Sequence, residues 1–91
     1  MNKIYKIKEG FVVRKIGDSY VVVAVGKRSK DFHGVITLNE TGAFLFEKLI
    51  EGRTKEDLIK DLLAEYDVTE ENANKDVDNF LNNLIKGDLI L

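Results

Sequence analysis

The chain has 91 residues, of which 44% are hydrophobic and 33% charged, and its net charge is −2. This composition is typical of one soluble globular domain, which we expect to span residues 1–91. The absence of cysteine excludes disulfides, thiolate metal sites and a thiol nucleophile. No apolar run is long enough to cross a membrane and the start lacks a signal-peptide core, so we expect a cytoplasmic protein.

The net charge hides two halves of opposite sign. Residues 1–33 carry a formal charge of +5, whereas residues 34–91 carry −7. Since a basic segment attracts anionic partners and an acidic one repels them, this division bears on the choice of partner.

The first half of the chain predicts three strands. Residues 11–16 and 20–25 are rich in β-branched residues, and the Gly-Asp pair at 17–18 suits the turn of a hairpin. After a polar, basic loop over 26–33, residues 34–38 form a third short β-branched segment. We expect an antiparallel meander with the second strand in the centre.

The second half predicts three helices, capped by Asn39, Thr54 and Thr69. Gly52 is expected to end the first helix and Gly87 the third, before an extended tail over 88–91. The expected apolar stripes are Ala43, Phe46, Leu49 and Ile50, then Leu58, Ile59, Leu62, Leu63 and Tyr66, then Ala73, Val77, Phe80, Leu81, Leu84 and Ile85.

Phe44 lies on the face of the first helix opposite its apolar stripe. A second packing surface, for a partner or a dimer, is one hypothesis for this residue.

Strands followed by helices indicate an α+β domain with the helices packed on one face of the sheet. The second and third helices, joined by residues 67–69, resemble a helix-turn-helix pair. The predicted fold class is therefore α+β and winged helix-turn-helix-like, with a three-stranded antiparallel sheet followed by three helices.

Residues that could support catalysis are few. His33 is the only histidine and has no carboxylates at ligand spacing, so a surface loop position is favoured over a metal or general-base role. The stretch 26–29 lacks the upstream glycine of a phosphate loop, and Ser19 and Ser29 have no paired base. We predict that the protein is not an enzyme and needs no cofactor or metal.

DNA binding is the first function that a helix-turn-helix suggests. A recognition helix normally carries Lys and Arg, because it approaches phosphates. The third helix instead has more acids than bases, with Glu70, Glu71, Asp76 and Asp78 against Lys75 and Lys86. Binding through this helix is disfavoured, although a regulator that binds DNA through its basic strands and loop remains an alternative. A structural module that dimerises through Val21, Val23 and Val25 is another.

The third strand, residues 34–38, has a free edge in a three-stranded meander. It contains no charge and no proline, so nothing in it blocks pairing with an added peptide strand. A helix or loop of the same chain that covers this edge is an equally favoured interpretation. In the third helix, Phe80 beside Asp76 and Asn83 is expected to be half-exposed, as a groove wall or as the ordinary margin of a helix core.

The segment Leu-Asn-Glu-Thr-Gly-Ala at 38–43 resembles a conserved part of the PqqD-like family. The similarity continues through Phe46, the Gly-Arg-Thr at 52–54, the Tyr-Asp-Val at 66–68 and Gly87, over about residues 10–90. The sequence departs from the family at Phe46, where the family often has Trp, and in the Lys-Gly-Asp-Leu at 86–89, which has a polar residue after the glycine.

This resemblance implies a RiPP recognition element. Such a domain binds the leader segment of a ribosomally made precursor peptide and presents it to a modifying enzyme, often a radical SAM protein, without being an enzyme itself. In the family the leader adds as a strand beside the third strand and lies against the third helix. Carried onto this sequence, the peptide-binding residues are Val35, Ile36, Thr37, Leu38, Asp76, Phe80, Asn83 and Leu84.

Two further expectations concern the leader itself. Apolar leader side chains are expected near Phe80 and Leu84. Acidic leader residues are expected near the basic loop, at Lys27, Arg28 and Lys30, because that half of the chain is positively charged.

Overall fold

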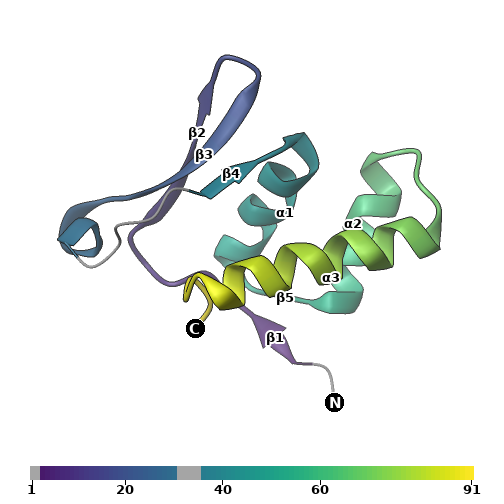
Figure 1. The fold of residues 1–91 in the computed structure, drawn as a ribbon. Helices are drawn as coiled ribbons and strands as arrows, with labels where there is room; N and C mark the ends of the chain where they lie inside the picture. Colours follow the sequence, from purple (N-terminus) through teal and green to yellow (C-terminus); the bar gives the residue numbers. More distant parts are fainter. Residues whose placement is uncertain (1–2, 31–35) are drawn as a thin grey trace.

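The computed structural model describes residues 3–30 and 36–91 (Figure 1). Predictions that fall on His33, Gly34 and Val35 therefore lie outside the described residues. The elements in chain order are β1 (Ile4–Tyr5), β2 (Phe11–Ile16), β3 (Ser19–Ala24), the 3-10 helix η1 (Gly26–Lys30), β4 (Ile36–Leu38), α1 (Glu40–Glu51), β5 (Arg53–Thr54), α2 (Lys55–Glu65) and α3 (Glu70–Lys86).

The main sheet has the order β2-β3-β4, and both pairings are antiparallel. The β2–β3 hairpin closes through Gly17 and Asp18, where Gly17 has a φ of 60° that the tight turn requires. The predicted meander with a central second strand is confirmed, and with it the α+β fold class.

The helices begin where the sequence predicts. The side-chain oxygen of Asn39 accepts a hydrogen bond from the Gly42 N–H at 2.7 Å. Thr54 caps α2 and Thr69 caps α3 in the same way, each at 3.1 Å. These bonds satisfy N–H groups that a helix cannot pair internally, so they fix the start of each helix.

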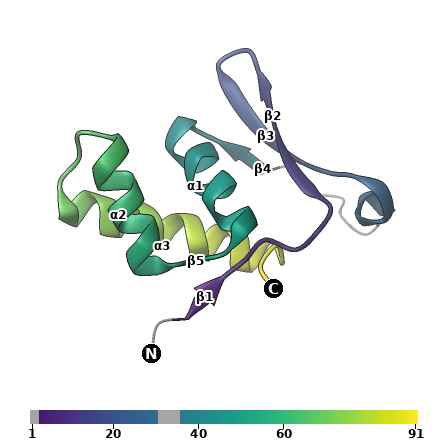
Figure 2. The ribbon, with the colours of Figure 1, turned by 180° about the vertical axis from the view of Figure 1, so that it is seen from behind.

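The helices lie on one side of the sheet, and the β2–β3 hairpin projects past them (Figures 1 and 2). Helix α1 occupies the centre, because it contacts all three strands of the sheet as well as α2. Its Leu45, Phe46 and Leu49 are at most 1% exposed. The sheet contributes fewer buried side chains to this core, chiefly Phe11 and Val22.

The predicted apolar stripes include several residues that are not buried. Ile50, Leu63 and Ile85 are 40%, 37% and 49% exposed, because each lies at the margin of its helix's buried arc. Leu45 is buried although the stripe omitted it, since α1 is covered on more than one side.

Phe44 does form a second packing surface, but within the same chain. Its ring meets Tyr66 edge to face, with centroids 5.5 Å apart, and Lys48 lies over the ring at 5.4 Å. Burial raises the pKa of the Tyr66 hydroxyl, and the nearby Glu40 adds to this effect.

The two ends of the chain meet, which the sequence analysis did not predict. Strand β1 pairs with β5, and Ile7 forms a bridge with Ile90. The Lys8 N–H donates to the Leu89 carbonyl at 2.8 Å. The expected extended tail is therefore held against the N-terminal segment. No helix in the described part of the chain has the length and apolar character to span a bilayer.

Candidate functional site

The hydrogen-bonding direction of the sheet is set by its hairpin. A two-residue turn closes on a hydrogen-bonded pair, which here is Ile16 with Ser19. At the far end of the same hairpin the Val25 N–H donates to the Gly10 carbonyl at 2.8 Å, in agreement with this alternation. Every second residue of β3, counted from Ser19, therefore bonds to β2, and the residues between them face β4.

Those intervening residues determine which backbone groups of β4 remain unpaired. Tyr20 and Val22 lie opposite Leu38 and Ile36, so these two pairs carry the hydrogen bonds between β3 and β4. Thr37 falls between them, and its N–H and C=O point to the outer edge. Neither group has a hydrogen-bond partner among the residues described here. Thr37 is therefore the residue at which a further strand could pair.

The side chains of β4 point alternately to the two faces of the sheet. Ile36 and Leu38 are partly buried against the core, whereas Thr37 is exposed on the outer face of the sheet. A Cβ placed on Gly87 would lie 3.3 Å from the Ile36 side chain, so the start of β4 packs beside the end of α3. The open edge therefore runs alongside α3.

A hollow of about 250 Å³ lies where β4 gives way to α1, between the start of α1 and the middle of α3. Three of the predicted site residues, Asp76, Phe80 and Asn83, line it together. Its remaining lining residues are Asn39, Thr41, Gly42, Leu45 and Asn79. The arrangement thus brings the predicted helix residues beside the end of the predicted strand.

The accessible wall of this hollow is more polar than the sequence suggested. Phe80 is only 7% exposed, so the prediction of a half-exposed aromatic is wrong, because the ring turns into the core instead. Leu84 has no exposed surface and does not line the hollow. Carboxamides and one carboxylate, from Asn39, Asp76 and Asn83, make up much of the accessible wall, and sequence reasoning missed Asn39 and Asn79.

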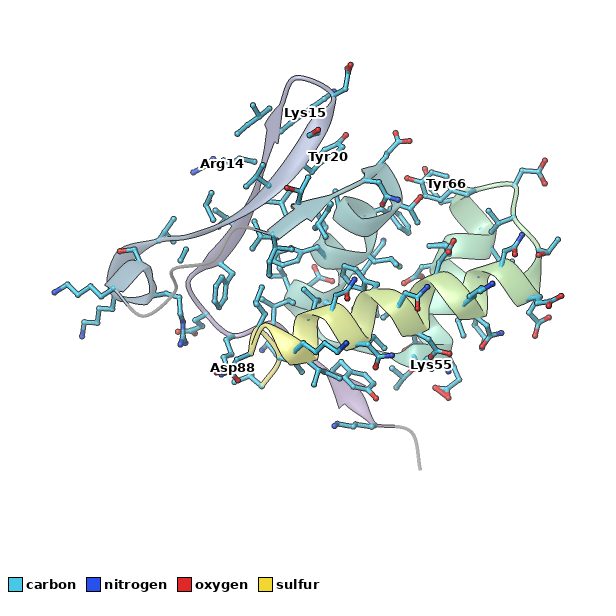
Figure 3. All side chains as sticks on the ribbon, viewed as in Figure 1. Arg14, Lys15, Tyr20, Lys55, Tyr66 and Asp88 are labelled. Atoms are coloured by element: carbon cyan, nitrogen blue, oxygen red, sulfur yellow. The ribbon has the colours of Figure 1, made fainter. Side chains whose placement is uncertain are left out.

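The basic residues of the expected loop lie on η1, at the end of the sheet where β4 begins. Lys27 and Lys30 are exposed and Arg28 is half-buried. Near them, the Lys8 ammonium lies 2.8 Å from the carboxylate of Asp88, which is labelled in Figure 3. Hydrogen bonding to Lys8 lowers the pKa of Asp88, and the positive charge of Arg28 contributes to the same shift.

The predictions on metal binding and dimerisation concern other surfaces of the domain. No group of three or more His, Cys, Asp or Glu side chains within residues 3–30 and 36–91 is placed to hold a metal. The outer face of the sheet, with Val21, Val23 and Val25, is not covered by a helix, and dimerisation through it stays a prediction (Figure 2).

Fold and site together define a small winged-helix-like α+β domain with a sheet edge, unpaired among the described residues, beside a helix. The family model described as "Coenzyme PQQ synthesis protein D (PqqD)" matches residues 19–90. The chain therefore belongs to the PqqD family, and the resemblance seen in its sequence is confirmed.

Two solved structures are similar to this chain. One is described as "TbiB1 in Complex with the TbiA(beta) Leader Peptide"; it shares 25% identity over 93% of each chain, with a TM-score of 0.70. The other, "Lasso peptide synthetase B1 complexed with the leader peptide", shares 20% identity over 96% of each chain, with a TM-score of 0.72, which supports the fold alone. A search of curated proteins found no match.

Proposed function

We propose that this chain is a peptide-binding module that binds the leader segment of a ribosomally synthesised precursor peptide and presents it to a modifying enzyme. The observation that carries the proposal is the outward N–H and C=O of Thr37, which have no partner among the described residues. The hollow beside Asn39 and Asp76 supports it, since it offers side-chain recognition next to that edge. The similar structure described as a complex with the TbiA(beta) leader peptide supports it as well.

The peptide adds as an antiparallel strand outside β4. Its residue opposite Thr37 forms both backbone hydrogen bonds and directs its side chain to the outer face, while the two neighbouring side chains point inward toward α3. One of those neighbours sits over the hollow lined by Asn39, Asp76 and Asn83. We expect a polar, hydrogen-bonding side chain there rather than the apolar one that the sequence suggested.

The module acts by binding and not by catalysis. Its role is to hold the leader extended, so that the remainder of the precursor is delivered at high effective concentration to a separate modifying enzyme in the cytoplasm, such as a radical SAM protein. Residues 1–91 act as one domain in this proposal.

The test is a proline at the outward position. Immobilised protein is used to select binders from an mRNA-displayed library of random 20-residue peptides, and the enriched peptides are resynthesised with fluorescein for anisotropy. Thr37→Pro removes the outward N–H and no bond between β3 and β4, which an edge strand tolerates, so we expect affinity to fall at least about tenfold while the fold is retained.

Thr37→Val is the matched control, because it alters the side chain and keeps the N–H. Circular dichroism and the urea midpoint should be nearly the same for both variants. Equal affinity of the Thr37→Pro and Thr37→Val proteins for every enriched peptide would refute strand addition at β4.

A further inference from the structure

Arg28 is held in place by three separate contacts. Its Nε donates to the Glu9 carbonyl at 3.0 Å, and its guanidinium lies 5.5 Å from the centre of the Phe11 ring. Gly10 permits the approach of its stem, because a Cβ at that position would lie 2.6 Å from the Arg28 Cβ. The guanidinium is therefore oriented before any ligand arrives.

This orientation leaves the donors of Arg28 largely unused. Within the described residues, neither terminal nitrogen has a hydrogen bond or an ion pair. The nearby carboxylate of Asp88 is bonded to Lys8 instead, at 2.8 Å. Because two parallel N–H groups of an arginine match the two oxygens of a carboxylate, the free side of Arg28 has the geometry of a carboxylate receptor.

The surroundings of Arg28 add space and positive charge. A hollow of about 390 Å³ is lined by Glu9, Gly10, Val25, Lys27 and Arg28. Lys27 is exposed in it, and Lys30 follows on the same short helix. Arg28 can form two parallel hydrogen bonds to one carboxylate, whereas the two lysines supply positive charge without that geometry.

The position of this hollow relates it to the open edge of β4. The Ile36 side chain packs against Gly87, and the next residue, Asp88, lies close enough to Arg28 for its pKa to be lowered by that charge. A strand that pairs with Thr37 and leaves past Ile36 therefore heads toward η1.

We infer that Arg28, assisted by Lys27, binds the carboxylate of an aspartate or glutamate side chain of the bound peptide, at the Ile36 end of β4. The inference rests on the proposed function, and it specifies which chemistry the peptide needs beyond its strand-pairing segment. It also assigns the expected attraction between the basic half of the chain and acidic peptide residues to one oriented side chain, that of Arg28.

The test uses peptides from the same selection that lose affinity for Thr37→Pro protein. They are synthesised with an amidated C-terminus, so that only side-chain carboxylates remain. Each Asp or Glu is replaced in turn by Asn or Gln, and binding is measured to wild-type and Arg28→Gln proteins. One replacement should cost about tenfold in wild type and less than about twofold in Arg28→Gln, as expected for a charged hydrogen bond in a double-mutant cycle.

Further variants separate the geometry from the charge. Arg28→Lys keeps the charge and loses the paired donors, so we expect it to recover only part of the affinity. Lys60→Gln on α2 removes one positive charge far along the chain and should change affinity less than about twofold. If Arg28→Gln protein does not fold, the double variant Lys27→Gln/Lys30→Gln replaces it. We expect this variant to bind the peptide about threefold more weakly, and high salt to weaken binding to the wild-type protein by a similar factor.

The two proposals fail in different ways. Peptides that lose affinity for Thr37→Pro protein but contain no acidic residue, or whose acidic residue contributes equally in the wild-type and Arg28→Gln proteins, overturn the carboxylate site alone. A selection in which no enriched peptide responds to Thr37→Pro overturns strand addition, and the carboxylate site with it.

Discussion

The helical half and the sheet half of this domain divide the work between them. The helices bury most of the core, including Phe46, Leu58 and Leu84 with no exposed surface. The sheet buries Val22 but leaves the Thr37 edge unpaired within the described chain, and its outer face lies away from the helices. Stability should therefore depend on the helical half and recognition on the sheet half. The four predictions below test this division.

The largest effect is expected at the centre of the helical half. Phe46→Ala removes a ring with no exposed surface and should lower the free energy of unfolding by about 3–5 kcal/mol, measured by urea denaturation. Ile50→Ala on the same helix is the control, because Ile50 is 40% exposed and should cost less than about 1 kcal/mol. Similar losses for the two variants would contradict the assigned core.

A smaller effect is expected at Gly10, which joins the sheet to the Arg28 site. Gly10 has a φ of 94°, so Gly10→Ala adds backbone strain of about 1–2 kcal/mol and also a clash with Arg28. Gly17→Ala is the control, with a φ of 60° and no atom within 4 Å of the added Cβ. The thermal midpoint should fall further for Gly10→Ala; equal midpoints would mean that Arg28 is not fixed against Gly10.

The cap of α3 should affect stability without affecting recognition. Thr69→Ala removes the bond to the Asn72 N–H, 3.1 Å long, and should cost about 1 kcal/mol of unfolding free energy. Thr69→Ser keeps an acceptor oxygen and should recover most of the loss. Because Thr69 lies at the start of α3 and does not line the hollow beside Asp76, affinity for a selected peptide should be unchanged at temperatures where the variant is folded.

The smallest effect concerns the pH dependence at the chain ends. The pKa of Asp88 lies below its ordinary value of 3.8 because Lys8 bonds to the charged form. This pair therefore stabilises the fold above about that value, and the contribution is lost as the pH falls through the lower folded-state pKa. NMR titration of the Asp88 carboxyl in Lys8→Met protein should show a pKa closer to 3.8; no change would rule out the pairing.

Local chemistry is the part of this fold that the sequence predicts well. The caps at Asn39 and Thr69 and the Gly-Asp turn at 17–18 all depend on neighbouring residues, so short patterns are enough to place them. The pairing of Ile7 with Ile90 depends on nearly the whole chain being folded. Residues 3–10 show no hydrophobic periodicity from which this pairing could be predicted.

The candidate site shows the same limit. The sequence and the family resemblance predict the strand edge and the helix residues Asp76 and Asn83. The structure places Asp76 and Asn83 in one hollow with Asn39, the residue that follows β4. Periodicity could not show that Phe80 turns inward, because a margin residue can rotate either way. Nor could it show that Arg28 is held by Glu9 and Phe11, since this depends on how η1 folds back over β2.

The meeting of the chain's two ends has a consequence for synthesis. Leu89 is fully buried and its carbonyl accepts from the Lys8 N–H, so the core cannot close until Leu89 has left the ribosome. The β2–β3 hairpin and the helices can form earlier, because their contacts are local. During that interval Ile7 and Lys8 lack the partners that Ile90 and Leu89 provide, whereas β1 can already pair with β5. Vectorial synthesis therefore leaves the Ile7–Ile90 bridge and the burial of Leu89 among the last contacts of this domain to form.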